Sequence, residues 1–353
     1  MVDDRATGTE EAVVVERERR PVEASLVRRL LAEFIGATLL VAVGSGAAAV
    51  SLMGPALRFE ALNVGNALQG APQERVVFQQ LFANSLGDLL PVAFAFAIIL
   101  GVLVYALGGV SGAHFNPAVT LALAAVRRFR WTEVIPYWVV QCLGGILGAA
   151  IIYGIYKEQA GEIISVVEQI DPATGQPAGT ADIPTAILFG ATVVADNIEF
   201  FQALLAEAVI GFILMTAIMA VAVDPRAPKG WSGLIIGLAL GGGILVTAQA
   251  TGGSANFARS LGPFVATVFF GEDQSIPWND LIVYAAGPVI GALLAAFIYE
   301  GVTGLERVSP APSPGAATPE PEALLDEVDE PATGSTVIES ETRRTDEKGP
   351  PAS

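Results

Sequence analysis

The segment Ser111-Gly-Ala-His-Phe-Asn-Pro-Ala-Val-Thr120 decides how this chain folds. It lies inside an uncharged apolar run over residues 89–126, far longer than the about 20 residues of one membrane-spanning helix. Glycine and proline interrupt the run near its middle, at Gly108, Gly109, Gly112 and Pro117. We therefore expect a spanning helix before the interruption and a separate short helix after it.

The residues at the interruption predict where the short helix begins. Asparagine is a favoured N-cap and proline is favoured at the first helical position, so Asn116 and Pro117 mark a helix start. An apolar helix over residues 118–126 rises only about 1.5 Å per residue, so it crosses about half of a bilayer.

A second copy of this segment lies downstream, at Gly252-Gly-Ser-Ala-Asn-Phe-Ala-Arg-Ser-Leu-Gly-Pro263. Asn256 matches Asn116 in the first copy, and Ala258 matches Ala118. Phe257 stands where the first copy has proline. Two half-helices at corresponding places of two halves are typical of a membrane pore built from an inverted repeat.

Composition agrees with a membrane protein of several helical spans. The 353 residues are 52% hydrophobic and 16% charged, below the about 25% charged residues of soluble domains, and the mean hydropathy is +0.56. The net charge of −17 lies mostly in the tails and connecting loops, so it argues only against a nucleic-acid partner. Spans are expected at about 30–52, 88–107, 133–156, 202–223, 232–249 and 280–299.

Three parts follow along the chain. Residues 1–27 are charged and residues 304–353 are acidic and rich in proline, so both are expected to be disordered cytoplasmic tails. Residues 28–303 form the membrane domain, with one repeat over about 28–156 and the other over about 202–303. Loops over 53–87 and 157–200 are expected to be long.

Positive charge predicts the orientation. Lysine and arginine gather at one set of predicted span ends, at Arg28, Arg29, Arg127, Arg128, Arg130, Arg226 and Lys229. By the positive-inside rule these ends and both termini are cytoplasmic, with the protein in the plasma membrane or inner cell membrane.

The two segments, His114-Phe-Asn-Pro-Ala-Val-Thr120 and Asn256-Phe-Ala-Arg-Ser260, resemble the paired Asn-Pro-Ala boxes of aquaporins and glycerol facilitators, the major intrinsic proteins. The resemblance covers about residues 28–301. It implies an all-α fold of six spanning helices and two re-entrant half-helices. It also implies a passive water channel that excludes ions and protons, works as a homotetramer and needs no cofactor.

The resemblance places the pore centre at Asn116, Pro117 and Ala118 with Asn256, Phe257 and Ala258. Helix N-termini carry partial positive charge, so two of them meeting there oppose cations. The two asparagine amides can donate hydrogen bonds to a passing oxygen. The ring of Phe257 either packs against Pro117 or narrows the centre.

The outer constriction of the family falls on four residues: Phe96, Ile244, Gly253 and Arg259. A charge at membrane depth indicates function by default, which favours Arg259 as a filter residue. Strict water channels usually have histidine where this chain has Ile244, and Gly253 adds room. We interpret the filter as wider and less polar than that of a strict water pore.

Three further residues complete the predicted site. Glu33 and Glu207 occupy matched places in the two repeats and are expected to hold the re-entrant loops through backbone N–H groups. His114, the chain's one histidine, is expected to line the inner pore. A metal site is not expected, since His114 lacks companion ligands, and Cys142 is the one cysteine.

Two alternatives remain open. A facilitator for glycerol or a similar neutral solute fits the filter residues. A non-conducting membrane scaffold is suggested by Phe257 and the long outer loops. An enzyme is not indicated, because no nucleophile–base set or phosphate loop accompanies the carboxylates.

Overall fold

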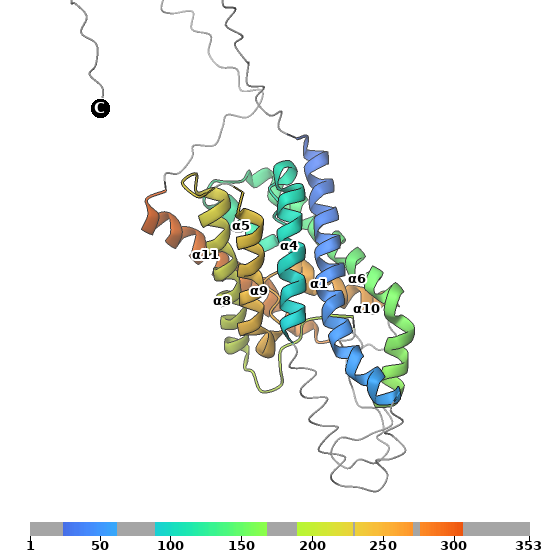
Figure 1. The fold of residues 1–353 in the computed structure, drawn as a ribbon. Helices are drawn as coiled ribbons and strands as arrows, with labels where there is room; N and C mark the ends of the chain where they lie inside the picture. Colours follow the sequence, from blue (N-terminus) through green and yellow to red (C-terminus); the bar gives the residue numbers. More distant parts are fainter. Residues whose placement is uncertain (1–23, 62–88, 168–188, 229, 271–275, 306–353) are drawn as a thin grey trace, which may run out of the picture. The chain divides into compact units, whose positions relative to one another are not determined.

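The computed structural model describes residues 24–61, 89–167, 189–228, 230–270 and 276–305 (Figure 1). The two predicted tails, apart from residues 24–27, 304 and 305, and much of the two predicted long loops lie outside these ranges. Within the described ranges, six helices are long and apolar enough to cross a membrane. They are α1 (Leu26–Ala61), α4 (Leu89–Ser111), α6 (Trp131–Val167), α8 (Phe200–Ile218), α9 (Ser232–Thr251) and α11 (Leu281–Thr303).

Shorter elements complete the described chain. Two short helices follow the two boxes: α5 (Pro117–Ala125) and α10 (Phe257–Phe270). A π-helical turn, η1 (Met219–Val223), continues α8, and a 3₁₀ turn, η2 (Trp278–Asp280), precedes α11. Six spans and two half-helices are the elements expected from the sequence.

The two halves of the chain pack in the same way. In the first half α1 packs against α6 and α4, and in the second half α8 packs against α11 and α9. Helices α4 and α9 pack against each other and join the halves, and α4 lies between α1 and α9 (Figure 1). The half-helices are exchanged, because α5 packs mainly on α11 and α10 mainly on α6.

Glycines bring the spanning helices close together. A Cβ placed on Gly144 or Gly148 of α6 would lie 2.5 Å from a backbone carbonyl oxygen of α1. Gly237 and Gly241 of α9 lie in the same way against the α4 backbone. Small residues of this kind let helix backbones approach in a membrane, where packing rather than water drives association.

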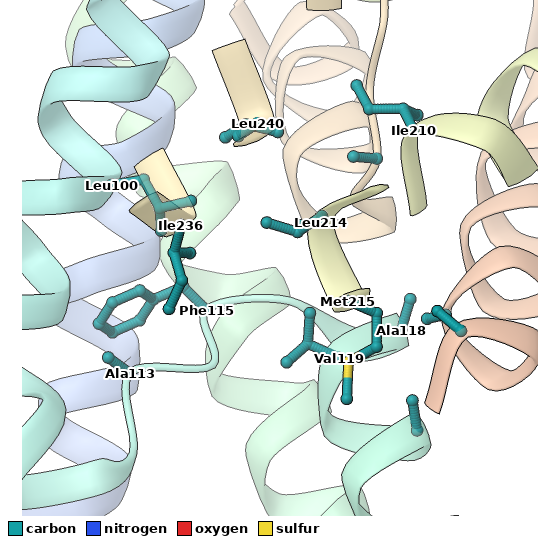
Figure 2. Packing of buried hydrophobic residues seen from close by; sticks show 14 of the residues in the cluster. Leu100, Ala113, Phe115, Ala118, Val119, Ile210, Leu214, Met215, Ile236 and Leu240 are labelled. Carbon is teal, nitrogen blue, oxygen red and sulfur yellow. The ribbon is translucent and has the colours of Figure 1, made fainter. Parts of the chain in front are cut away.

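Buried apolar side chains from both halves gather around the first half-helix (Figure 2). Val119 of α5 lies in this cluster with Leu214 and Met215 of α8. Leu100 of α4 and Ile236 of α9 belong to the same cluster. The half-helix is therefore held by side chains of the other repeat as well as by its own.

Helix bounds differ from the expectation at three places. Helix α4 runs through Gly108 and Gly109 and ends at Ser111, with Gly112 at φ +91°. Glycine does not by itself end a helix in a membrane, where every backbone N–H and C=O needs a hydrogen-bond partner. Helix α4 therefore continues through Gly108 and Gly109 and ends at the positive φ of Gly112. Helices α1 and α6 extend to Ala61 and Val167, because helical hydrogen bonding does not stop where the apolar run stops.

Outside the spanning part, Asp224 ties the α8–α9 connection to α11. Arg226 donates from Nε and Nη2 to the two carboxylate oxygens, at 2.8 and 2.6 Å. The Tyr299 hydroxyl donates to the same carboxylate at 3.0 Å, and Arg226 Nη1 donates to the Thr303 carbonyl at 3.3 Å. The hydrogen bonds from Arg226 hold the pKa of the Asp224 carboxyl well below its usual range.

Replacing Asp224 by asparagine is expected to lower the melting temperature at neutral pH and to matter less in acid. The folded-state pKa lies below the unfolded value of about 3.9. The stabilisation is therefore complete above that value and is lost as the pH falls toward the folded-state pKa. Thermal unfolding of both proteins as a function of pH measures this difference. A gap between their melting temperatures that stays constant in acid would contradict the assignment.

Candidate functional site

The two half-helices meet end to end through their capping asparagines. Asn116 Oδ1 accepts from the Ala118 N–H at 2.9 Å, and Asn256 Oδ1 accepts from the Ala258 N–H at 3.0 Å. Each carboxamide also reaches the opposite loop, because Asn116 Nδ2 donates to the Ala255 carbonyl and Asn256 Nδ2 to the Phe115 carbonyl, both at 2.8 Å. An amide NH₂ carries two hydrogens, so one N–H of each asparagine remains for another acceptor.

A cavity of about 60 Å³ lies against both asparagines. One water needs about 10–15 Å³ of such space, so the cavity has room for roughly four to six waters. Only five of the residues that line it are polar: His114, Asn116, Ser254, Asn256 and Arg259. The rest of the wall is mostly apolar and comes from both repeats: Leu40, Leu100, Val104, Val119, Leu123, Leu214, Ile218, Ile236 and Leu240 among others.

Glu33 of α1 holds the first re-entrant loop through both of its carboxylate oxygens. Its Oε1 accepts from Ser111 Oγ at 2.7 Å and from the His114 N–H at 3.0 Å. Its Oε2 accepts from the Phe115 N–H at 2.6 Å and from Gln141 Nε2 at 2.9 Å. One buried carboxylate thus satisfies four donors that the membrane interior could not satisfy.

Glu207 of α8 does the same for the second loop. Its Oε1 accepts from Thr251 Oγ1 at 2.6 Å and from the Ser254 N–H at 2.9 Å. Its Oε2 accepts from the Ala255 N–H at 2.8 Å. The two carboxylates therefore make equivalent hydrogen bonds to the two loops, and both side chains are fully buried.

The Glu33 and Glu207 carboxylates hold the backbone of the two loops in a strained conformation. Phe115 has φ +48° and Ala255 has φ +57°, a left-handed conformation that costs a residue with a Cβ about 1–2 kcal/mol. Ala113 and Gly253 repeat the pattern two residues earlier, at φ +53° and +59°. The fixed carboxylate–backbone hydrogen bonds explain how both loops keep this geometry.

Arg259 lies at the start of α10 and is buried. Its Nη1 donates to the Gly190 carbonyl at 2.8 Å, and its Cζ lies 5.1 Å from the centre of the Phe96 ring. Both Phe96 and Arg259 line the cavity. Its Nε has no hydrogen-bond partner among the described residues, which leaves a buried donor beside the cavity.

Ile244 and Gly253 contact each other, and neither is among the residues that line the cavity. A Cβ placed on Gly253 would lie 3.2 Å from Ile244 Cα and 3.1 Å from Thr247 Oγ1, so it would press on α9. The positive φ of Gly253 and this contact give a backbone reason for glycine here. Their role in a filter stays a prediction.

Comparison with known proteins identifies the fold and its class. The family model described as major intrinsic protein matches residues 21–299. The chain belongs to the major intrinsic protein family. Aquaporin AqpM of Methanothermobacter thermautotrophicus is 37% identical over 281 residues, covering 79% of this chain and 98% of that protein.

More distant relatives widen the comparison. Glycerol uptake facilitator protein-like 6 of Lactiplantibacillus plantarum is 33% identical over 214 residues, covering 60% of this chain and 84% of that protein. The crystal structure of the aquaglyceroporin from Plasmodium falciparum shares the fold, with a TM-score of 0.57 at 21% identity, covering 79% of this chain and 97% of that one.

The family resemblance and the all-helical fold predicted from the two boxes are therefore confirmed. This major intrinsic protein is an aquaporin-type channel, an integral membrane protein of several spans and not an enzyme. In the described part of the chain no group of three metal-ligating side chains lies close enough to hold a metal ion.

His114 lines the cavity of the channel with its ring packed among aromatic neighbours. Its Nδ1 lies 3.2 Å from Thr120 Oγ1, and its ring lies 4.8 Å from that of Phe129 and 5.4 Å from that of Tyr137. Its backbone N–H, like that of Phe115, donates to Glu33. The residue therefore belongs to the loop anchor as well as to the lining.

The sequence analysis missed a matched pair of tyrosines. The Tyr137 hydroxyl donates to the Ser111 carbonyl at 2.9 Å, and the Tyr284 hydroxyl donates to the Thr251 carbonyl at 2.8 Å. Both side chains are fully buried, and both close the end of the helix that leads into a box. The sequence does carry a signal for this pair, because each tyrosine lies near the start of the third span of its repeat.

A second missed feature is the segment over residues 189–198, which contacts the end of α9 and the start of α11. The Ala195 N–H donates to the Ala250 carbonyl at 3.0 Å and the Val194 N–H to Asp280 Oδ2 at 2.9 Å. Thr192 Oγ1 lies 2.7 Å from Ser260 Oγ. This segment places the Gly190 carbonyl that accepts from Arg259.

Phe257 is half-buried and is not among the residues that line the cavity, whereas Pro117 is buried. Helix α10 begins at Phe257, so the helix forms without proline at that position. Its absence from the cavity lining favours packing of the ring over narrowing of the pore centre, and this choice stays a prediction.

Replacing Phe257 by proline is accordingly expected to leave water permeability unchanged and the melting temperature the same or slightly higher. Proline is favoured at the first helical position and reduces the freedom of the unfolded chain. Stopped-flow osmotic shrinkage of vesicles and thermal unfolding in detergent measure the two quantities. A marked rise in permeability would show that the phenylalanine ring obstructs the pore.

Proposed function

We propose that this channel conducts water in single file, together with small uncharged solutes, and excludes ions and protons. The observation that carries the proposal is the pair of carboxamides at the cavity, each with one N–H remaining after its bond to the opposite loop. Two donors at one place hold the oxygen of a passing water by both lone pairs. That water cannot then accept a proton from its neighbour in the file.

Charge exclusion is proposed to rest on fixed positive potential. The N-termini of α5 and α10 point at the same place from opposite sides, and each carries about half a positive elementary charge. Arg259 adds a full charge farther along the cavity. A cation meets both barriers, and the apolar remainder of the wall offers it few oxygen ligands in compensation.

The outer constriction is proposed to comprise Phe96, Ile244, Gly253 and Arg259. The contact between the Arg259 guanidinium and the Phe96 ring supports two of these residues directly. With an aliphatic residue and a glycine as the other members, the filter offers few polar contacts. We propose that a neutral solute somewhat larger than water passes it.

Facilitation of glycerol is the second candidate function. The filter residues favour it, as does the similarity to a protein named as a glycerol uptake facilitator. Stopped-flow light scattering on vesicles containing the purified protein, challenged in turn with water, urea and glycerol gradients, separates the candidates. Shrinkage no faster than that of empty vesicles would refute conduction and leave the membrane-scaffold alternative.

Replacing Asn116 by aspartate is expected to reduce water permeability and weaken cation exclusion. Aspartate keeps the capping oxygen and nearly the same shape but removes the Nδ2 donor and adds negative charge at the pore centre. The same change at Asn197, an exposed loop residue, is the matched control. Equal permeability and equal cation leak in the two variants would remove the carboxamide from the mechanism.

The setting of the channel is also a proposal. We propose that both termini are cytoplasmic and that the protein lies in a plasma or inner cell membrane; the arginines at one end of the spans support this orientation. The channel domain is proposed to span residues 28–303 and to assemble as a homotetramer in the lipid bilayer. Protease digestion of intact and opened vesicles tests the orientation, and crosslinking in the membrane tests the assembly.

A further inference from the structure

Helix α1 supplies no side chain to the proposed outer constriction, yet it lies directly behind it. A Cβ placed on Gly44 would lie 2.5 Å from Phe96 Cζ and closer still to Cε1 and Cδ1 of the same ring. Real Cβ atoms do not approach carbon this closely, so the ring occupies space that only a glycine leaves. Gly44 is buried in the α1–α4 contact.

The Phe96 ring that lies against Gly44 also lines the cavity that we propose as the permeation path. Phe96 is 3% exposed and lines the cavity, and the Arg259 guanidinium lies 5.1 Å from the ring centre. A ring pushed off α1 has α1 behind it and the cavity before it. Because the α1 backbone blocks movement the other way, we expect a displaced ring to move into the cavity and reduce its open width.

The next residue of α1 supports the other component of the constriction. A Cβ placed on Gly190 would clash with the Ser45 carbonyl, and Gly190 has φ +76°. The Gly190 carbonyl in turn accepts the hydrogen bond from Arg259. Two consecutive residues, Gly44 and Ser45, thus lie behind both Phe96 and Arg259.

We propose that Gly44 is a specificity-determining positioning residue: by leaving room for the Phe96 ring it sets the width of the outer constriction and hence the largest neutral solute that passes. The inference rests on the proposed function, because it needs Phe96 to be part of the constriction. It adds a residue of α1 that touches no solute and acts through the ring.

The test compares Gly44→Ala with Gly46→Ala on the same helix. Both changes replace a buried glycine of α1 by alanine, but a Cβ on Gly46 would meet Ile152 at an ordinary 3.6 Å. The remaining variants are Phe96→Ala and the double variant Gly44→Ala/Phe96→Ala. Vesicles with each protein are challenged with water, urea and glycerol, and permeabilities are compared for the largest solute that the unmodified channel passes.

Gly44→Ala is expected to reduce that permeability by about tenfold, the lower end of the discrimination that one misplaced methylene causes in a tight site. Gly46→Ala is expected to behave like the unmodified channel. The double variant has no Phe96 ring that the new methyl group could displace. The permeability and melting temperature of the double variant should therefore equal those of Phe96→Ala. This rescue is the result that a purely structural role of Gly44 does not produce.

Two results would overturn the inference. One is an unchanged permeability in Gly44→Ala, and the other is an equal loss, in permeability or in melting temperature, in the Phe96→Ala background. The second comparison still decides the matter when Gly44→Ala alone does not fold. Failure of the proposed function has a different signature, since Phe96→Ala would then leave solute permeability unchanged.

Discussion

Replacing Glu33 by alanine is expected to abolish the folded channel. The change leaves four buried N–H or O–H groups without their acceptor. They are the Ser111 hydroxyl, the His114 and Phe115 backbone N–H groups, and one N–H of Gln141 Nε2, which also donates to Thr120 Oγ1. Each such donor costs about 1–3 kcal/mol, so together they approach the whole net stability of about 5–15 kcal/mol. Size-exclusion profiles and melting temperatures in detergent measure the loss.

The control for this prediction is Glu158→Ala. The side chain of Glu158 is 80% exposed, so its removal is expected to change stability by no more than about 0.5 kcal/mol. Glu207→Ala leaves three donors rather than four and is expected to rank just behind Glu33→Ala. A Glu33→Ala protein with the profile and melting temperature of the unmodified channel would show that water replaces the carboxylate.

Replacing Arg259 by valine is expected to raise cation leak by about a hundredfold or more and to admit larger neutral solutes. At an effective dielectric constant of about 20, a cation about 4 Å from a fixed positive charge is repelled by about 4 kcal/mol. A barrier of that height slows cation passage by more than about a hundredfold. Valine removes this repulsion and the donor groups, and it adds width beside Phe96. Vesicle conductance and glycerol-driven swelling measure the two effects.

Arg259→Lys separates charge from shape in the same experiment. Lysine keeps the positive charge, so cation exclusion should persist. It lacks the planar fork that reaches the Gly190 carbonyl while lying by the Phe96 ring, so neutral-solute selection should change. Cation leak in Arg259→Val no greater than in Arg259→Lys would remove the charge of Arg259 from the barrier.

Much of the fold was predictable because its signals are local. The N-cap at Asn116 and the apolar run before it specify a half-helix without any knowledge of the rest of the chain. The second box repeats the pattern, so α10 could be predicted even with phenylalanine in place of proline. The matching positions of Glu33 and Glu207 in the two halves followed from the repeat.

What could not be predicted depends on contacts between distant segments. Gly190 lies in a stretch with no span-like pattern, and its importance comes only from meeting Ser45 and Arg259 in space. Gly44 looks like any small residue of an apolar helix until the Phe96 ring is placed against it. The backbone reason for Gly253 likewise appears only with its positive φ.

The exchange of half-helices between the repeats has a consequence for biogenesis. Helix α11, the last of the described helices to leave the ribosome, is the helix against which α5 mainly packs, and α5 is made in the first half. Until α11 has been inserted, α5 lacks the helix against which it mainly packs. Helix α10 packs against α6 but still lacks its smaller contact with α11. We therefore expect a chain that stops before Leu281 to form no working pore, because α5 then lacks the helix against which it mainly packs.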